Sequence, residues 1–571
     1  MLTSTVKSLA SGLTAVALAS GLSACVAQSS ENDSRDYDRL ILTNGQIYTV
    51  NSQQPWAESV VVEGHTIIYV GSEQDAERYI NDSSKVIDLK GKMVLPGIHD
   101  THLHPLEAAL ENFTCVLSEE GSVNHWLATV EECLEQSPKK SSEWLLGWGH
   151  SLTTLTESEY APKALLDELP TDRPIAIMEA TSHSAWVNSK ALKLLGINSK
   201  SENPVGGAIL RWDNNEPSGI LLDNAGDQVF HAALSPTSDS LQAAYESLLI
   251  GLDEVAANGI TSIVDARVYW QRGYQDAWKR ANDNGTLTAR TVLSLWAYPD
   301  MDDAEQITRL KSMFSNNPES LLRANQIKLY SDGITHNTTA ALLKPYKDYF
   351  EEVGPIGLNY FSQSRLAHYV KALGETGFDM HIHTIGDRGV RESLNAIEQH
   401  QVKGARHRLT HVEMVSEQDK PRFKELNVIA DFQLAGDFTK PEHHHEMEPL
   451  IGERAHKQLP VRDIYETGAT ITLSSDWDVS SLSPFVGMQN ALTRGHQSLP
   501  SLDAVIRAYT INGAYNMRQE HITGSIEVGK KGDFTVIDQN LFDVPATSIA
   551  ETEVVFTILG GDVVFDRARD K

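Results

Sequence analysis

The chain has 571 residues, enough for one very large hydrophobic core or for two or three smaller ones. Its formal net charge is −29 and no basic tract offsets it, so the surface is expected to repel phosphate backbones, and nucleic acid is not expected as a partner. The three cysteines form no Cys-x-x-Cys pair, so zinc fingers and thioredoxin-like redox chemistry are not indicated.

Residues 1–25 have the pattern of a lipoprotein signal peptide. Lys7 precedes a weakly apolar run that is too short to span a membrane and ends in Leu22-Ser23-Ala24-Cys25. This ending resembles the bacterial lipobox, so we expect Cys25 to carry lipid and to anchor the protein in the cell envelope, facing the periplasm. An Asp directly after the lipidated cysteine would hint at retention in the inner membrane. This chain has Val26 there, which favours the outer membrane. The alternative is an ordinary cleaved signal with an incidental cysteine.

The polar residues 26–38 are expected to form a flexible tether. If Cys25 carries lipid, Cys115 and Cys133 remain as an even pair in a compartment that permits disulfides. A bridge between them and two buried free thiols are both compatible with the sequence, because spacing alone does not fix the distance between their Cα atoms.

Both ends of the body have strand-like patterns. Residues 40–42 and 46–50 flank the turn signal Asn44-Gly45, and residues 59–63 and 66–71 flank Gly64-His65, which predicts two hairpins. Strand-like runs return near the C-terminus, at 534–538, 554–559 and 562–565. Neither end can bury a sheet face alone, so we expect residues 39–96 and 515–571 to pair into one small β-sandwich.

The middle, residues 97–514, alternates helix-like and strand-like segments. The helix-like segments are 241–258, 363–374 and 390–399, and the strand-like ones are 260–265, 291–296, 327–330, 378–383, 408–411 and 470–474. This alternation predicts an α/β fold with a mostly parallel sheet, either a closed eight-stranded barrel or an open doubly wound sheet. No Gly-x-Gly-x-x-Gly follows a strand, which disfavours a dinucleotide site. Residues from about 110 to 240 break the alternation and are expected to form an insertion.

The strand-like run 93–105 ends in His102-Leu103-His104. Alternate residues of a strand share a face, so these two imidazoles are spaced to bind one metal ion. An isolated polar pair at a strand end is the alternative interpretation.

Further chemistry-bearing residues stand near the ends of later strands. Lys328 lies between apolar residues, where a lone ammonium is costly, so it must be paired, shifted to a low pKa or modified. His381 and His383 repeat the strand spacing, His411 ends another strand, and Asp476 follows one more. In a barrel these strand ends converge on the face where active sites are built.

With these motifs the chain resembles the metal-dependent amidohydrolase superfamily, in particular its amidohydrolase family 3 branch. The matching segments are 96–105, Lys328 to Gly333, His383 to Asp387, 406–411, Ser475-Asp476-Trp477, 509–512, 524–530 and the insertion motif 183–188. Thr410 and Asp478 depart from the residues that are frequent in the family at these positions.

The resemblance implies a (β/α)8 TIM-like barrel with one or two divalent metal ions, most simply zinc. His102 and His104 would ligate the first metal, His383 and His411 the second, and a carboxylated Lys328 would bridge them. Asp476 would touch the first metal and act as general acid/base for a metal-activated hydroxide. His183 and Trp186 are expected to line the substrate pocket or to pack a lid, and His381 to support the ligands from behind.

The resulting prediction is an enzyme that cleaves a C–N bond, in an amide, formamide or cyclic amide, of a small-molecule substrate. The same site acting on an ester or phosphoester is an alternative, and a non-catalytic, lipid-anchored binding protein is another. The run His443-His444-His445, in a polar Pro-Glu context, is interpreted as a solvated loop rather than a second metal site.

Overall fold

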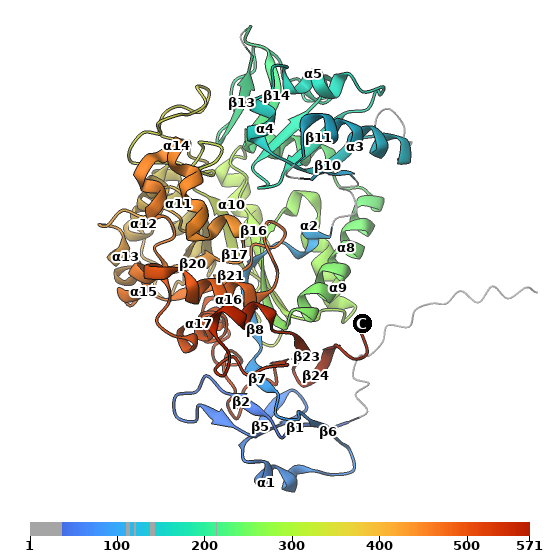
Figure 1. Cartoon of the computed structure of the whole chain (residues 1–571), viewed down its shortest axis with the longest axis vertical. Coiled ribbons are helices and arrows are strands. Elements are labelled where there is room, and N and C mark those ends of the chain that lie inside the picture. Colours follow the sequence, from blue (N-terminus) through green and yellow to red (C-terminus); the bar gives the residue numbers. More distant parts are fainter. Residues whose placement is uncertain (1–36, 110–114, 119–120, 138–142, 213, 571) are drawn as a thin grey trace, which may run out of the picture. The chain divides into compact units, whose positions relative to one another are not determined.

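A computed structural model describes residues 37–109, 115–118, 121–137, 143–212 and 214–570, all within one compact unit, Arg35–Lys571. Cys25 and the predicted signal peptide lie outside the described residues. The fold is mixed α/β, with one eight-stranded sheet, two six-stranded sheets and one four-stranded sheet in the described ranges (Figure 1).

The eight-stranded sheet is parallel throughout and forms a nearly closed barrel. In order around the barrel its strands are β8 (Ile98–Leu103), β15 (Ile260–Val268), β16 (Arg290–Trp296), β17 (Leu322–Tyr330), β18 (Asp379–Thr384), β19 (Arg408–His411), β20 (Ile429–Gln433) and β21 (Ile471–Ser474). This order follows the sequence, as expected when each strand is linked to the next by a crossover on the outside. The choice that the sequence left open is therefore resolved in favour of the (β/α)8 barrel.

The barrel closes between β8 and β21, at the strand ends that carry the predicted metal ligands. Here the backbone N–H of Asp476 donates to the carbonyl of His102 at 2.8 Å, and the N–H of His104 donates to the carbonyl of Trp477 at 2.6 Å. The N–H of Ser475 also donates to the carboxylate of Asp100 at 3.2 Å. These bonds hold the first and last strands together at the candidate site.

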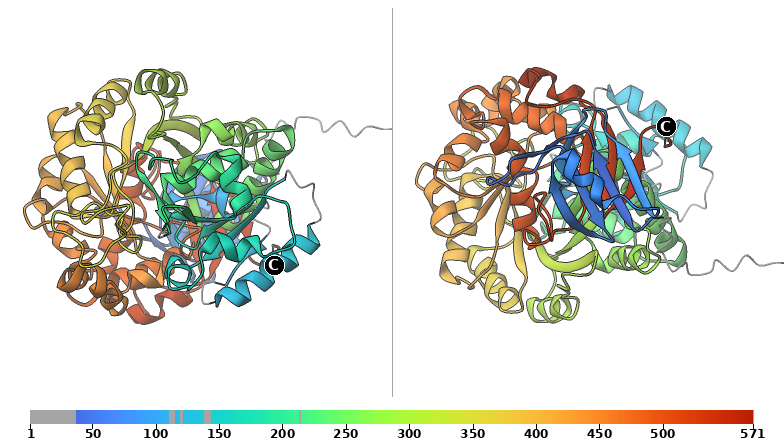
Figure 2. Two further views of the ribbon diagram at one scale, coloured as in Figure 1. Left: turned by 90° about the horizontal axis from the view of Figure 1, so that it is seen from above. Right: turned by 90° about the horizontal axis from the view of Figure 1, so that it is seen from below.

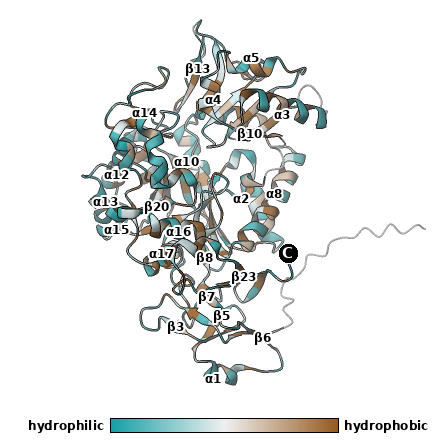
Figure 3. Ribbon diagram, in the orientation of Figure 1, coloured by the Kyte–Doolittle hydropathy of each residue, from teal (hydrophilic) through white to brown (hydrophobic). Residues whose placement is uncertain are grey.

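The strands are connected by helices that surround the barrel (Figure 2). The main ones are α8 (Ser238–Ala257), α9 (Tyr274–Asp283), α10 (Asp303–Ser312), α11 (Gln363–Gly374), α12 (Asp387–Gln399), α13 (Lys420–Glu425), α15 (Val461–Glu466), α16 (Pro484–Thr493), α17 (Leu502–Ala508) and α18 (Ile511–Asn516). In α12 the buried residues Val390, Leu394 and Ile397 recur at helical spacing, so one face packs on the barrel while the other stays hydrophilic (Figure 3). No helix in the described ranges is long and apolar enough to cross a membrane.

The two chain ends build one β-sandwich. One sheet contains β1 (Arg39–Thr43), β4 (Ser59–Glu63), β5 (Thr66–Gly71) and β6 (Ser84–Asp88), and the other contains β2 (Gln46–Tyr48), β3 (Trp56–Ala57), β7 (Met93–Pro96), β22 (Phe534–Ile537), β23 (Val554–Leu559) and β24 (Asp562–Asp566). β7 pairs antiparallel with β22, so strands from the two termini lie side by side (Figure 2). Leu42 and Val62 of one sheet share a core with Val94 and Val536 of the other.

The first predicted hairpin is wrong and the second is confirmed. β4 and β5 pair antiparallel across Gly64-His65. β1 and β2, which flank Asn44-Gly45, belong to different sheets: β1 pairs with β4 and β6, and β2 with β3 and β7. The turn carries the chain from one layer of the sandwich to the other, so the two strands that flank it pair with different partners.

A buried ion pair links the barrel to the sandwich. The guanidinium of Arg290, on β16, donates to both carboxylate oxygens of Asp533, beside β22, at 2.7 and 3.1 Å. We expect Asp533→Ala to lower the free energy of unfolding by about 3 kcal/mol, because it leaves a buried guanidinium unpaired. Arg462→Met, which breaks the exposed Arg462–Glu466 pair, is the control and should cost less than about 1 kcal/mol. Urea unfolding of the two variants measures this difference, and equal losses would contradict it.

A separate sheet occupies the region where the sequence breaks the alternation. Its strands are β9 (Cys115–Val116), β10 (Leu145–His150), β11 (Ile175–Glu179), β12 (Ser184–Val187), β13 (Gly207–Arg211) and β14 (Pro217–Asp223), with helices α3 (Val123–Gln136), α4 (Leu152–Thr156), α5 (Pro162–Asp167), α6 (Ser189–Leu194) and α7 (Asn224–Ala233). Cys115 and Cys133 form a disulfide that ties α3 to β9. The sequence allowed either a bridge or two free thiols, and the structure has the bridge.

Candidate active site

The structure brings the residues that were predicted to bind metal to the C-terminal ends of the barrel strands. The positions are His102 on β8, His104 just before the short helix α2 (Pro105–Ala108), Lys328 on β17, His383 on β18, His411 at the end of β19 and Asp476 after β21. Five of these elements are strands of one barrel, so their carboxyl ends share a rim although the residues are far apart in sequence.

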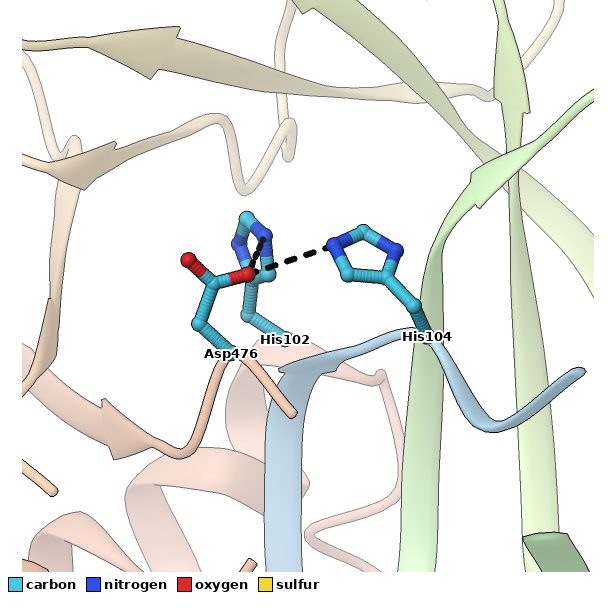
Figure 4. Close-up of side chains that lie close together, drawn as sticks. All are labelled: His102, His104 and Asp476. Atoms are coloured by element: carbon cyan, nitrogen blue, oxygen red, sulfur yellow. Dashed lines mark hydrogen bonds and ion pairs between the residues drawn. The ribbon is translucent and has the colours of Figure 1, made fainter. Parts of the chain in front are cut away.

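Asp476 is the centre of the first half of the cluster. Its Oδ1 lies 3.2 Å from Nε2 of His102 and 3.2 Å from Nε2 of His104 (Figure 4). On its other side, Oδ2 lies 3.8 Å from Nδ1 of His411. One ligand atom each from His102, His104 and Asp476 lie within 4.8 Å of one another, a spacing that one cation could bridge.

Lys328, His383 and His411 extend the cluster. Nζ of Lys328 is buried, 3.4 Å from Nε2 of His102. The imidazole rings of His383 and His411 have their centroids 4.5 Å apart. Nε2 of His383 lies 3.2 Å from the carbonyl oxygen of Gly333, to which it donates, while its Nδ1 is buried without a hydrogen-bond partner among the described residues. That unpaired ring nitrogen is free to ligate a metal.

Burial sets the charge states of the cluster. It lowers the pKa of His102 and His383 well below the ordinary histidine value and that of His411 to about 3, so the neutral, ligating forms dominate. Burial also lowers the pKa of Lys328 well below its usual range, which favours the free amine. For Asp476 burial acts to raise the pKa, but its contacts with His102 and His104 outweigh burial and hold the pKa well below the usual range.

Two of these residues have an unusual backbone conformation. His411 and Asp476 lie in the left-handed region, with φ of +71° and +59°. Neither is glycine, so each conformation costs of the order of 1 kcal/mol, and such strain is concentrated at functional sites.

A cavity of about 180 Å³ opens beside the cluster and is lined by His383, His411 and Asp476. The separate sheet contributes His150, Glu179 and His183, and the segment after β17 contributes His336 and Asn337. The apolar wall comprises Leu152, Ile334, Ile385, Phe438, Leu459 and Val479. An apolar pocket with a few convergent polar groups is typical of small-molecule sites.

The amidohydrolase family model matches residues 85–565, which include the barrel, the separate sheet and the part of the sandwich formed by β7 and β22 to β24. The chain belongs to the amidohydrolase family. It is 25% identical to the N-substituted formamide deformylase of Arthrobacter pascens, over 92% of this chain and 98% of the relative. It is likewise 25% identical to the LONG AFTER FAR-RED 3 protein of Arabidopsis thaliana, over 92% of this chain and 91% of the relative. A metal-dependent hydrolase from Pyrococcus horikoshii OT3 has the same fold, with a TM-score of 0.68, 21% identity and coverage of 89% of this chain and 99% of that one.

In this amidohydrolase His381 lies behind the cluster, where the sequence placed it. Its Nε2 is 3.0 Å from Nδ1 of His102, and Arg408 donates to its Nδ1 at 2.7 Å. His102, His381 and Asp431 also fall within metal-binding distance of one another, but Asp431 already accepts hydrogen bonds from surrounding hydroxyl groups. His381 therefore stays a predicted positioning residue for His102 rather than a predicted ligand.

Asp431 and Gln433, on β20, are buried polar residues next to the candidate site that the sequence analysis missed. The buried carboxylate of Asp431 accepts hydrogen bonds from the hydroxyls of Thr101, Thr410, Thr472 and Ser474, at 2.7 to 3.1 Å. Thr410 in turn lies 2.8 Å from Nδ1 of His102. The signal was present in Ile-Ala-Asp-Phe-Gln, where polar and apolar residues alternate as on a strand with two different faces.

The two residues of the insertion motif have different surroundings. His183 lines the cavity, its ring centroid 5.3 Å from that of His383, and its Nδ1 donates to Oδ1 of Asp223 at 2.7 Å. Trp186 is instead fully buried in the core of the separate sheet, where its Nε1 donates to the carbonyl of Pro162 at 2.7 Å. Of the two roles left open for Trp186, lining the pocket is therefore wrong, because alternation along β12 turns the indole into the core of the separate sheet.

Proposed function

We propose that this amidohydrolase cleaves a C–N bond in an amide, formamide or cyclic amide. The observation that carries the proposal is the convergence of His102, His104 and His411 on the Asp476 carboxylate at the mouth of an apolar cavity. The formamide deformylase among its relatives, which matches over almost the full length of both chains, supports the choice of bond.

The donor set fits divalent zinc, because neutral imidazole, carboxylate and carbamate oxygens are ligands that zinc accepts. His102, His104 and Asp476 would hold one ion, and His383 and His411 a second. Lys328, whose burial favours the neutral amine that reacts with carbon dioxide, would bridge them once carboxylated. When bound, the metal supplies Lewis acidity and lowers the pKa of a water to about 7.

The chain's own proton carrier is Asp476. Its Oδ1 is engaged by His102 and His104, whereas Oδ2 lies 3.8 Å from Nδ1 of His411, and Asp476 lines the cavity. We assign to Oδ2 the removal of a proton from the attacking water and its delivery to the leaving nitrogen. A nitrogen leaving group needs this proton because an amide anion is a poor leaving group.

The cavity wall favours a neutral substrate. Among the described residues that line it there is no Lys or Arg, while Glu179, Glu413 and Asp476 are carboxylates. Burial raises the pKa of Glu413 to about 7. A dianionic phosphoester would meet no cationic side chain here, which disfavours that alternative. An uncharged N-substituted formamide or amide matches the wall better.

The imidazole of His183 is placed to contact the substrate. Asp223 fixes its ring, and the hydroxyl of Tyr360 donates to the same Asp223 oxygen at 3.1 Å. We expect His183→Asn to lower kcat/KM by about 10- to 100-fold through loss of a positioned hydrogen-bonding group, with zinc content unchanged. Steady-state kinetics and elemental analysis measure both effects. His521→Asn, at an exposed histidine, is the control, and unchanged kinetics in His183→Asn would remove His183 from the site.

A substrate panel tests the proposed function. Zinc-loaded protein is assayed on matched N-substituted formamides, amides, cyclic amides, esters and phosphoesters. We expect turnover of at least one C–N substrate, and loss of that turnover in Asp476→Asn. Turnover of esters or phosphoesters alone would contradict the choice of bond, and no turnover of any member with zinc bound would favour a binding protein.

We further propose that Cys25 carries lipid and holds the enzyme in the bacterial cell envelope, facing the periplasm at the outer membrane. The support is the Leu-Ser-Ala-Cys sequence and the Val that follows it. Mass spectrometry of the mature N-terminus should find diacylglyceryl on Cys25. An unmodified N-terminal peptide that starts elsewhere would refute the anchor.

A further inference from the structure

A second cavity, of about 430 Å³, shares no lining residue with the active-site cavity. Its wall comes from the segment around α13, the 3-10 helices η4 (Pro441–Met447) and η5 (Gly452–Lys457), α15 and the residues that follow α16. Its lining has three cationic side chains, Lys420, Lys457 and Arg494, and three histidines, His444, His456 and His496, beside the two carboxylates Glu417 and Asp463.

Arg494 is the unusual member of this wall. It caps the C-terminus of α16 and its side chain is only 3% exposed. None of its three guanidinium nitrogens has a hydrogen-bond partner among the described residues. Burial lowers the pKa of Arg494 only to about 10, so it stays charged at neutral pH. A buried guanidinium with no bond is costly, and native proteins normally satisfy such a group with a carboxylate, a water or an ion.

The carboxylates that line the cavity are already in use. Glu417 and Asp463 both pair with Lys420, each at 2.7 Å. Lys457 has no ion pair within the described ranges. Arg494 and Lys457 are therefore left as two cations without a lining partner, and Glu442 acts on Arg494 only through space. This leaves a net positive charge around a cavity that is large enough to hold water or a small ion.

His444 adds a second unsatisfied donor. The interpretation of residues 443–445 as a solvated loop is wrong for this residue: His444 lies in η4, is 6% exposed, and its Nε2 has no hydrogen-bond partner in the described part of the chain. Burial, followed by the nearby Arg494, lowers its pKa to about 4, so it is neutral at physiological pH. A neutral imidazole can still donate one N–H into the cavity.

We propose that this cavity binds a small oxyanion of the phosphate or sulfate type, on the guanidinium of Arg494. The planar fork of an arginine matches two oxygens of such an anion, and the anion would supply the counter-charge that the wall lacks. A metal cation is disfavoured by the same surplus of positive charge. The site is separate from the catalytic cluster and does not depend on the proposed reaction.

Calorimetric titration of zinc-loaded protein with inorganic phosphate, at constant ionic strength with chloride as the reference anion, tests the proposal. Wild-type protein should bind phosphate, and Arg494→Met should weaken binding by at least about tenfold, the effect of losing a bidentate charged pair. Arg494→Lys, which keeps the charge but not the fork, should fall in between. Arg309→Met, at an exposed arginine on α10, is the matched control and should bind as wild type.

Two results would overturn the proposal. Absence of phosphate binding by the wild-type protein at tens of millimolar would show that the cavity holds only water. Binding that persists unchanged in Arg494→Met would place the phosphate elsewhere, for example on the catalytic metal. If Arg494→Met does not fold, the wild-type titration and the weaker binding expected for Arg494→Lys still test the proposal.

Discussion

Asp476→Asn is expected to lower kcat/KM for a C–N substrate by about a thousandfold. An asparagine keeps the shape of the side chain and still reaches His102 and His104, but it cannot take a proton from water or deliver one to a leaving nitrogen. Steady-state kinetics on the best substrate of the panel measures the loss. Elemental analysis of the same preparation should still find zinc, because the histidines and Lys328 remain.

The control for this variant is Asp276→Asn, at an exposed carboxylate on α9. It changes the same functional group without contact to the cluster, so its kinetics should equal those of the wild type. If Asp476→Asn retained more than about a tenth of the activity, proton transfer would have to be assigned to another group. His183 and Glu413, which line the same cavity, would be the next residues to substitute.

Lys328→Met is expected to separate activity from stability. It removes the bridging group, so hydrolysis should fall by about a hundredfold or more and the protein should lose one bound metal ion. Without metal, the free energy of unfolding of the variant should nevertheless exceed that of the wild type by about 1–2 kcal/mol. Methionine fills the same buried space, and it has no amine that must be buried without a good hydrogen-bond partner. Kinetics, elemental analysis and urea unfolding of the metal-free proteins give the three readouts.

The sign of the stability change makes this test specific. Lys311→Met, at an exposed lysine on α10, provides the control and should change the free energy of unfolding by less than about 0.5 kcal/mol. A large loss of stability in metal-free Lys328→Met would show that Lys328 is a structural residue with its own partners. Full activity in this variant would exclude Lys328 from the metal centre.

The sequence predicts the convergence of the candidate metal ligands better than the pocket around them. His102 and His104 are two residues apart in an apolar strand. Alternate residues of a strand share a face, so the local pattern already predicts that both side chains lie on the same face of the barrel strand. The strand β18, predicted at 378–383 and observed at Asp379–Thr384, shows how well buried parallel strands are predicted from their apolar runs.

Features that depend on distant partners are predicted less well. β20 was missed because Asp431 interrupts its apolar pattern, yet this carboxylate is satisfied by hydroxyls from three other strands. The Asn44-Gly45 turn joins two sheets because β2 pairs with β7, about 45 residues further along the chain, and not with β1. Trp186 was expected either to line the pocket or to pack a lid, and the pairing of β12 with β11 and β14 places it in the core of the separate sheet. Each outcome is decided by tertiary packing, which a local pattern does not contain.

The ratio of metal to protein, measured by elemental analysis of zinc-loaded wild type and His102→Ala, tests the central claim most directly. The account predicts about one or two zinc ions per wild-type chain and the loss of at least one in His102→Ala, together with its hydrolytic activity. The same zinc content and the same hydrolysis in both proteins would contradict it.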